Sequence, residues 1–293
     1  MPSVGSALRR TVGLRLPIVF TVALVAACGG GSPSITAPPN GPPPSDSAIS
    51  FPGFDISQFP GILAMDAWKF PASPFPWSGY YLYAPCHRDS TWTGQYRALT
   101  SAGWGLAAIY VGQQDWTQIP ADLAPLDVRA SRSVAAERFV TCSTSLLSKA
   151  QGLAEAADAA AKLRDDGFPD RSVVFLDVEY VTSVTPALLD YYGAWVAGIL
   201  QDGHYTPGVY AAKANAQVLY DSAVALYRAA GRGDAPPFWI ASSVNFSTSR
   251  VPADVGFSFA QLWQGLFDVQ ESYNGVTLTV DVDIAAKASP SAP

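Results

Sequence analysis

The stretch Ser172-Val-Val-Phe-Leu-Asp-Val-Glu-Tyr180 decides the fold class of this chain. It is a run of strand-forming residues that ends in two carboxylates, Asp177 and Glu179. Side chains alternate along a strand, so both acids lie on one face with Val173 and Phe175, while the opposite face is also apolar. A strand that is apolar on both faces is typical of a buried parallel sheet. Because α/β folds place their sites at the carboxyl ends of such strands, we predict a functional site here, with ordinary surface acids as the alternative.

Seven further segments share this strand character, and helical stretches separate several of them. The predicted strands are residues 53–56, 79–83, 105–112, 172–179, 208–211, 238–242, 260–264 and 278–284. The predicted helices are residues 145–166, 185–203 and 214–230, with Pro186 opening the second and glycines ending the first two. Residues 60–77 are rich in proline and predict an irregular loop. Eight strands with helices between them predict an α/β fold, a single-domain (β/α)8 TIM-type barrel.

The first 28 residues have the features of a lipoprotein signal peptide. Arginines precede an apolar run over residues 16–27, which stops at Cys28 and is too short to span a membrane. Leu24-Val-Ala-Ala-Cys28 resembles a bacterial lipobox, in which the cysteine becomes the lipidated first residue of the mature protein. The pair Arg9-Arg10 leaves twin-arginine export as an alternative route. We therefore expect an exported protein, anchored to a membrane through Cys28 on the periplasmic or extracellular side.

The rest of the chain divides into three parts. Residues 29–50 are mainly Gly, Pro, Ser and Thr, with hardly any large apolar side chain, and predict a flexible tether. Residues 51–287 are long enough for one large domain with its own core. Residues 288–293 predict a short disordered tail.

Charge and metal-binding residue types exclude several classes of function. The net charge is -6 and the basic residues are scattered, which argues against a nucleic-acid partner. The chain has only two histidines, His87 and His204, and no Cys/His cluster with ligand spacing, so we expect neither a metal site nor an organic cofactor. Cys86 and Cys142 remain once Cys28 is set aside. In an oxidising exported location we expect them to form a disulfide, with two free thiols as the alternative.

Five short segments, taken in order, carry a resemblance to a known family. They are residues 53–57 (Gly-Phe-Asp-Ile-Ser), 175–179 (Phe-Leu-Asp-Val-Glu), 207–210 (Pro-Gly-Val-Tyr), 261–264 (Gln-Leu-Trp-Gln) and 280–283 (Val-Asp-Val-Asp). Across residues 51–285 the chain resembles the glycoside-hydrolase-like domain of unknown function 1906, a relative of the family 25 glycoside hydrolase lysozymes. The resemblance implies a cleft lined by Asp55, Asp177 and Glu179, in which Glu179 donates the proton to the glycosidic oxygen.

Elementary chemistry supports the same three residues. Glycoside cleavage needs one carboxyl that stays protonated and a second that stays ionised. If Asp55, Asp177 and Glu179 converge on one barrel mouth, mutual repulsion and partial burial should raise at least one pKa, and Glu179, nearest the strand end, is the candidate acid. Retaining and inverting mechanisms both stay open, as does a mechanism in which Asp177 orients a 2-acetamido group of the substrate. For Asp55, a purely structural hydrogen-bonding role is the alternative.

Aromatic, amide and further acidic residues near the predicted strand ends form a candidate substrate-binding set. Sugar rings stack their C–H faces on aromatic rings, and amides can bind the hydroxyl groups. The predicted contacts are Tyr110, Gln113, Gln114, Tyr210, Trp239, Trp263, Gln264, Asp281 and Asp283. The alternative for the aromatic residues is core packing, and for Asp281 and Asp283 it is the satisfaction of loop amides.

Two classes of function fit these observations. The first is an exported, lipid-anchored glycoside hydrolase, muramidase-like, that cleaves a cell-wall glycan such as peptidoglycan by carboxylate acid catalysis. The second is a non-catalytic glycan-binding or envelope-organising barrel that keeps the acids without turnover. The intact set of Asp55, Asp177 and Glu179 favours the enzyme. The sequence selects neither the sugar, which could also belong to another polysaccharide, nor the oligomeric state.

Overall fold

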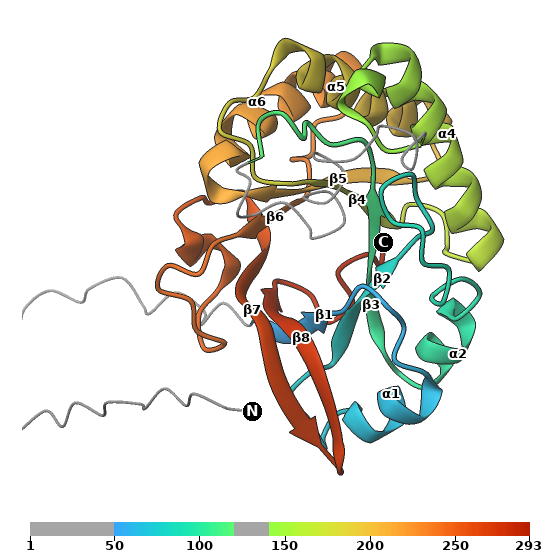
Figure 1. The fold of residues 1–293 in the computed structure, drawn as a ribbon, viewed down its shortest axis with the longest axis vertical. Coiled ribbons are helices and arrows are strands. Elements are labelled where there is room, and N and C mark those ends of the chain that lie inside the picture. Colours follow the sequence, from blue (N-terminus) through green and yellow to red (C-terminus); the bar gives the residue numbers. More distant parts are fainter. Residues whose placement is uncertain (1–49, 120–140) are drawn as a thin grey trace, which may run out of the picture. The chain divides into compact units, whose positions relative to one another are not determined.

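A computed structural model describes residues 50–119 and 141–293, in which eight strands form a closed barrel in the order β1 to β8 (Figure 1). The strands are β1 (Phe51–Asp55), β2 (Trp77–Tyr81), β3 (Gly105–Val111), β4 (Val173–Val178), β5 (Thr206–Ala212), β6 (Phe238–Ala241), β7 (Ala260–Tyr273) and β8 (Val276–Ala285). Each overlaps a predicted strand, and the TIM-type barrel is confirmed. The predicted signal peptide with Cys28, and the tether up to residue 49, lie outside the described residues.

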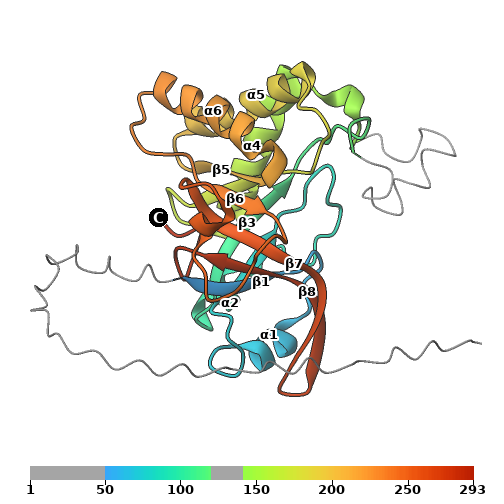
Figure 2. The ribbon, with the colours of Figure 1, turned by 90° about the vertical axis from the view of Figure 1, so that its left-hand side faces the viewer.

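Helices surround the barrel, mostly where the sequence predicts them. They are α1 (Ile62–Trp68), α2 (Tyr96–Ser101), α4 (Lys149–Asp166), α5 (Pro186–Asp202) and α6 (Lys213–Ala229), with the short 3-10 turns η1 (Thr144–Leu146) and η2 (Pro252–Val255). Figure 2 shows α4, α5 and α6 together on one side, beside β4 to β6. The prediction of an irregular loop over residues 60–77 is partly wrong, because Ile62–Trp68 form α1 before the prolines begin. Within the described ranges, no helix combines the length and apolar character needed to cross a membrane.

Strand β8 departs from the regular (β/α)8 pattern. Strands β1 to β7 pair in parallel, whereas β8 runs antiparallel to both β7 and β1. No helix connects β7 to β8. They form a long hairpin instead, closed by Asn274-Gly275, both of which have positive φ, as a tight two-residue hairpin turn requires. The direction of β8 decides which of its side chains reach the mouth of the barrel.

The side chains of the barrel strands separate into an inner and an outer core. Val173 and Phe175 of β4 pack inside the barrel with Trp77, Ile109 and Trp239. The alternate residues of β4 pack in the outer core, which includes apolar side chains of α4, α5 and α6. The prediction that β4 is buried on both faces is therefore confirmed, and the face shared by Val173, Phe175 and Asp177 is the inner one.

The prediction that residues 288–293 form a disordered tail is wrong. Ser291 is buried, its N–H donates to the carbonyl of Leu106, and its carbonyl accepts from the N–H of Val173. Its Oγ also accepts from the N–H of Ala108 at 2.8 Å. A Cβ on Gly105 would lie only 1.9 Å from the carbonyl oxygen of Ala288, so the close approach of the tail requires glycine there. The tail therefore packs against β3 and β4 near their amino ends. Composition suggested disorder because these residues are small and polar.

The predicted disulfide between Cys86 and Cys142 is present, with a Cα–Cα distance of 5.0 Å. Cys86 follows β2, and its N–H donates to the carbonyl of Val111 at the end of β3. Cys142 lies just before η1. The disulfide therefore ties the segment that leads into α4 to the carboxyl ends of β2 and β3.

Candidate functional site

The three predicted catalytic acids meet at the carboxyl ends of the parallel strands. Asp55 is the last residue of β1, Asp177 lies near the end of β4, and Glu179 follows β4 on the same inner face. The charge of Asp55 raises the pKa of both Asp177 and Glu179, which shows that the three carboxyls share one environment. The barrel thus brings together residues more than 120 positions apart.

Asp55 is held from both sides. The Tyr81 hydroxyl donates to its Oδ1 at 2.6 Å, and Gln264 Nε2 donates to its Oδ2 at 2.8 Å. Gly79, on β2 beside Asp55, leaves space for the Asp55 side chain, since a Cβ on Gly79 would lie 2.6 Å from Asp55 Cβ. Burial raises the pKa of Asp55 to about 6, and hydrogen bonds from Tyr81, Asp283 and Gln264 oppose the rise. Asp55 is thus a desolvated carboxyl whose charged form has several donors.

Gln264 links Asp55 to Asp281 of β8. Its amide nitrogen donates to Asp281 Oδ2 at 2.8 Å as well as to Asp55, and its carbonyl oxygen accepts from the Tyr210 hydroxyl. Asp281 Oδ1 accepts the backbone N–H of Asp268 at 2.7 Å. Burial raises the pKa of Asp281 to about 7, with the charge of Asp55 adding to the rise. Both amide protons of Gln264 are therefore used to hold carboxylates in place.

Asp283 lies beneath this layer and is fully buried. Trp239 Nε1 donates to its Oδ1 at 3.1 Å, whereas no conventional donor reaches its Oδ2. Burial and the charges of Asp55 and Asp281 raise its pKa well above the ordinary value. The raised pKa favours the protonated form of Asp283, and a protonated carboxyl oxygen needs no donor.

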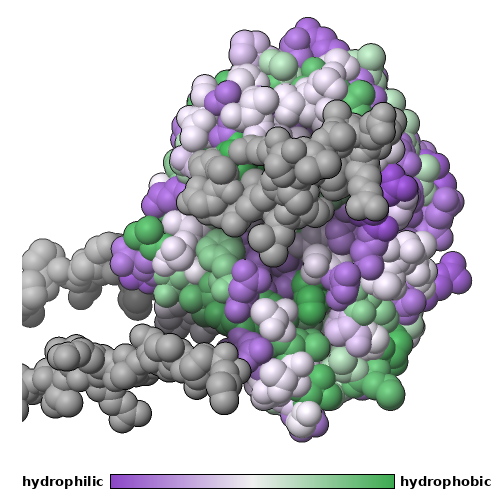
Figure 3. Space-filling view, in the orientation of Figure 1, coloured by the Kyte–Doolittle hydropathy of each residue, from purple (hydrophilic) through white to green (hydrophobic). Residues whose placement is uncertain are grey.

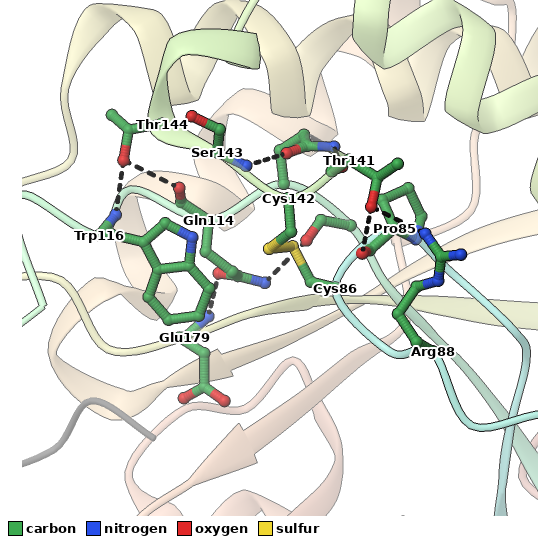
Figure 4. The surroundings of a disulfide bond; sticks show 12 residues. Pro85, Cys86, Arg88, Gln114, Trp116, Thr141, Cys142, Ser143, Thr144 and Glu179 are labelled. Carbon is green, nitrogen blue, oxygen red and sulfur yellow. Dashed lines mark hydrogen bonds between the residues drawn. A yellow bond between two sulfur atoms is a disulfide. The ribbon is translucent and has the colours of Figure 1, made fainter. Parts of the chain in front are cut away.

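The end of β4 is shaped by Gln114. Its Nε2 donates to the carbonyl of Asp177 at 2.9 Å, and its Oε1 accepts the backbone N–H of Glu179 at 3.1 Å. Figure 4 shows the Glu179 carboxylate directed away from Gln114, and Glu179 and Trp116 both line the pocket described below. Gln114 therefore sets the backbone direction that carries Glu179 into the mouth.

Asp177 and Glu179 differ in their surroundings. Asp177 is buried, its Oδ1 has no hydrogen-bond donor, and its pKa is raised well above the ordinary value by desolvation and by the charges of Glu179 and Asp55. Glu179 is exposed to solvent, yet the protein around it raises its pKa by desolvation. The backbone N–H of Tyr180 opposes that rise and the charge of Asp55 adds to it.

A pocket of about 320 Å³ opens beside Glu179. Its lining consists of Trp116, Ile119, Glu179, Tyr180, Tyr210, Ala212, Ala241 and Phe267. A single acid in an otherwise largely apolar and aromatic lining is the composition expected of a small-molecule or sugar-ring site. Among the described residues, no group of His, Cys, Asp and Glu is arranged to hold a metal ion.

Tyr210, Gln264 and Asp281 are in or beside the mouth, as predicted. Trp239 and Asp283 lie below it, where Trp239 is about 1% exposed and packs inside the barrel against Trp77 and Phe175. The structure therefore places Trp239 and Asp283 under the acids and out of reach of a bound sugar.

Three predicted substrate contacts lie elsewhere. The Tyr110 hydroxyl donates to Asp158 of α4, and Trp263 is buried in the outer core, with Nε1 donating to the carbonyl of Ser242 at 2.7 Å. Gln113 Nε2 donates to Glu155 of α4 and to the carbonyl of Thr141, and Gln113 does not line the pocket. Tyr110 and Trp263 each follow an inward residue, so the alternation of the strand turns them outward.

Several residues that the sequence prediction missed belong to the site, among them Trp116 and Tyr180, which line the pocket. Tyr81 donates to Asp55, and Phe267 lines the pocket. The sequence held a usable signal for Tyr81. It lies in the predicted strand 79–83, two positions after Gly79, so the two residues share one face of that strand. Phe267 had none, because an irregularity of β7 decides its direction.

Comparisons with known proteins agree with this architecture. The family description "Rv2525c-like, glycoside hydrolase-like domain" matches residues 66–285. No curated protein matches the chain. An uncharacterized B. stearothermophilus protein of known structure has 16% identity and a TM-score of 0.51, over 80% of this chain and 95% of that one, and shows a shared fold.

Two further solved structures are similar at lower scores. The spore cortex lytic enzyme SleM of Clostridium perfringens has 14% identity and a TM-score of 0.49, over 80% of this chain and 67% of that one. The Tat-secreted protein Rv2525c of Mycobacterium tuberculosis, in complex with L-tartrate, has 15% identity and a TM-score of 0.45, over 79% of this chain and 93% of that one.

Proposed function

The chain belongs to the Rv2525c-like, glycoside hydrolase-like family, and from this premise we propose that it hydrolyses glycosidic bonds of a cell-wall glycan such as peptidoglycan. The observation that carries the proposal is the pairing of an accessible acid with a buried one. Glu179 lines an open pocket and has a raised pKa, while Asp55 is buried, with two donors to its carboxylate. Glycoside hydrolysis uses two carboxyls in different environments, one that donates a proton and one that supplies negative charge.

In the proposed mechanism Glu179 is the general acid. Its raised pKa keeps a larger fraction protonated near neutral pH, and its position in the pocket lets it reach a glycosidic oxygen. Asp55 supplies the negative charge, because Tyr81, Gln264 and Asp283 all favour its ionised form. That charge stabilises an oxocarbenium-like transition state. Asp177, between them and without a donor on Oδ1, is the group available to contact the reacting sugar.

We place this activity outside the cytoplasm, with Cys28 as the lipid-carrying residue and residues 29–50 as the tether. The Cys86–Cys142 disulfide supports an oxidising location, since such bonds are rare in reducing compartments. Labelling of the protein with a radioactive or clickable fatty acid, in the parent and in Cys28→Ala, tests the anchor. Loss of the label in the variant is expected, and an equal label in both would overturn the assignment.

The central experiment incubates the protein with purified peptidoglycan and measures released fragments by mass spectrometry. The parent is compared with Glu179→Gln and with Glu271→Gln, a matched substitution on the β7–β8 hairpin outside the pocket. New reducing ends are expected from the parent and from Glu271→Gln but not from Glu179→Gln. If no protein releases fragments while all bind the glycan equally, the chain is a glycan-binding barrel and the hydrolase proposal is wrong.

A further inference from the structure

Strand β7 is irregular where it passes the mouth. Its pairing with β8 shifts register between Gln264 and Leu266, and again between Leu266 and Val269. Asp268 in this interval has φ of 53°, in the left-handed region that non-glycine residues seldom adopt. Bulges of this kind occur beside active sites, where they redirect a side chain.

The side chain redirected here is Phe267. It lines the pocket together with Glu179, Tyr180, Tyr210 and Trp116, and 45% of it remains exposed. Figure 3 shows hydrophobic residues gathered on the face that carries the β6–β7 connection and β7. An exposed aromatic ring on this bulge forgoes the free energy that burial of its apolar surface would supply. The arrangement is accounted for if a ligand covers the ring.

Asp281 maintains the bulge. Its Oδ1 accepts the N–H of Asp268, directly after Phe267, while its Oδ2 accepts the amide of Gln264 that also holds Asp55. One carboxyl therefore joins the segment that presents Phe267 to the network that positions Asp55. Hydrogen bonds of 2.7–2.8 Å therefore fix the backbone next to Phe267 relative to Asp55 and Asp281.

We propose that Phe267 is the platform of a sugar subsite next to Glu179, on which a pyranose ring of the substrate stacks its C–H face. The inference rests on the proposed function in taking the ligand to be a glycan. The aromatic lining of the pocket fits the apolar face of the ring, and the carboxyl of Glu179 lies where the ring's oxygen substituents would be. Asp281 acts as a positioning residue for this platform.

Binding of chitotetraose and of soluble peptidoglycan fragments, measured by calorimetry on the full chain carrying Glu179→Gln so that no turnover intervenes, tests the subsite. Phe267→Ala should weaken binding of at least one probe by about tenfold, the effect of losing an aromatic stacking partner and its buried area. Phe267→Trp should retain binding. Leu266→Ala, a neighbour that is 40% exposed and does not line the pocket, should bind like the parent.

Each other outcome counts against the subsite. Equal binding by Phe267→Ala and the parent overturns it, as does an equal loss in Leu266→Ala, which would indicate damage to the bulge. Absence of binding of both probes to the Glu179→Gln parent also overturns it. Phe267→Leu, which retains apolar bulk without a ring, should lose affinity even if Phe267→Ala does not fold. Failure of the hydrolase proposal is distinguishable, because binding that depends on Phe267 would persist without any release of fragments.

Discussion

Replacing Asp177 by Asn should stabilise the folded protein at alkaline pH. Asp177 is buried among other acids, its Oδ1 has no donor, and the charges of Glu179 and Asp55 oppose its ionisation. An uncompensated buried polar group typically costs about 1–3 kcal/mol. An amide of the same shape still has an oxygen without a donor, but it removes the buried charge and its repulsion from Glu179 and Asp55, so the free energy of unfolding should rise by about 1–3 kcal/mol. For a domain of this size the melting temperature should increase by about 2–10 °C.

The direction of the pH dependence follows from the raised pKa. Asp177 binds its proton more tightly in the folded protein than in the unfolded chain, where its pKa is about 3.9. The stability due to that proton is complete below the unfolded pKa and is lost as pH rises through the folded pKa. The amide of the Asp177→Asn variant does not titrate. The difference between variant and parent should therefore be small at pH 4 and largest at pH 8.

Thermal or urea unfolding followed by circular dichroism at pH 4 and pH 8 measures this difference. Asp190→Asn is the matched control, because Asp190 forms an exposed ion pair with Lys149 at 3.3 Å and should change stability little at either pH. A variant less stable than the parent at pH 8, or equally stabilised at pH 4 and pH 8, would show that the Asp177 charge carries no such cost. The gain should be accompanied by loss of hydrolysis, since the proposed mechanism uses this carboxyl.

Three further substitutions probe the supports of the site. Gly79→Ala places a Cβ 2.6 Å from that of Asp55, and should lower hydrolysis at least about tenfold while destabilising the fold by about 1–3 kcal/mol, as measured by fragment release and urea unfolding. Tyr81→Phe removes a donor to Asp55 and should raise the pKa of that carboxyl above its value of about 6, measurable by NMR titration of the side-chain carbon. Replacing Cys86 and Cys142 together by serine should lower the free energy of unfolding by about 4 kcal/mol in urea, because the bond closes a loop between residues 56 positions apart. Unchanged hydrolysis by Gly79→Ala would show that the added Cβ does not disturb Asp55. An unaltered pKa of Asp55 in Tyr81→Phe, or an unchanged urea midpoint in the double serine variant, would contradict the reason given for that substitution.

The sequence predicts the barrel well because its strands are short apolar runs at regular intervals. A run that is apolar on both faces indicates a strand that is buried on both faces. An apolar run does not indicate whether a strand is parallel or antiparallel to its neighbours. For this reason the sequence does not predict the antiparallel direction of β8. A local signal was nonetheless present. Asn274-Gly275 is a characteristic hairpin turn between residues able to form strands, and its use would have extended β7 to Tyr273 and reversed β8.

The candidate site divides along similar lines. Asp55, Asp177 and Glu179 were identified because acids at the ends of apolar strands are costly unless they are used or paired. Tyr110 and Trp263 were misplaced because the choice of face along a strand was not applied to them. A shift of one position along a strand moves a side chain to the opposite face of the sheet. The residues that point into the barrel are therefore Ile109, next to Tyr110, and Leu262, next to Trp263.

The reversal of β8 also explains why Asp281 and Asp283 have different roles. In a parallel strand the later residue would lie nearer the mouth, so Asp283 would be the accessible acid. In the antiparallel strand Asp281 pairs with Asp55 at the mouth, whereas Asp283 pairs with Gly53 one layer deeper. Asp281 can therefore join Gln264 to the β7 bulge, while Asp283 is fully buried beneath Asp55, accepts a hydrogen bond from Trp239 and has a pKa raised by burial. The division of labour between these acids is a consequence of strand direction, which alternation alone cannot specify.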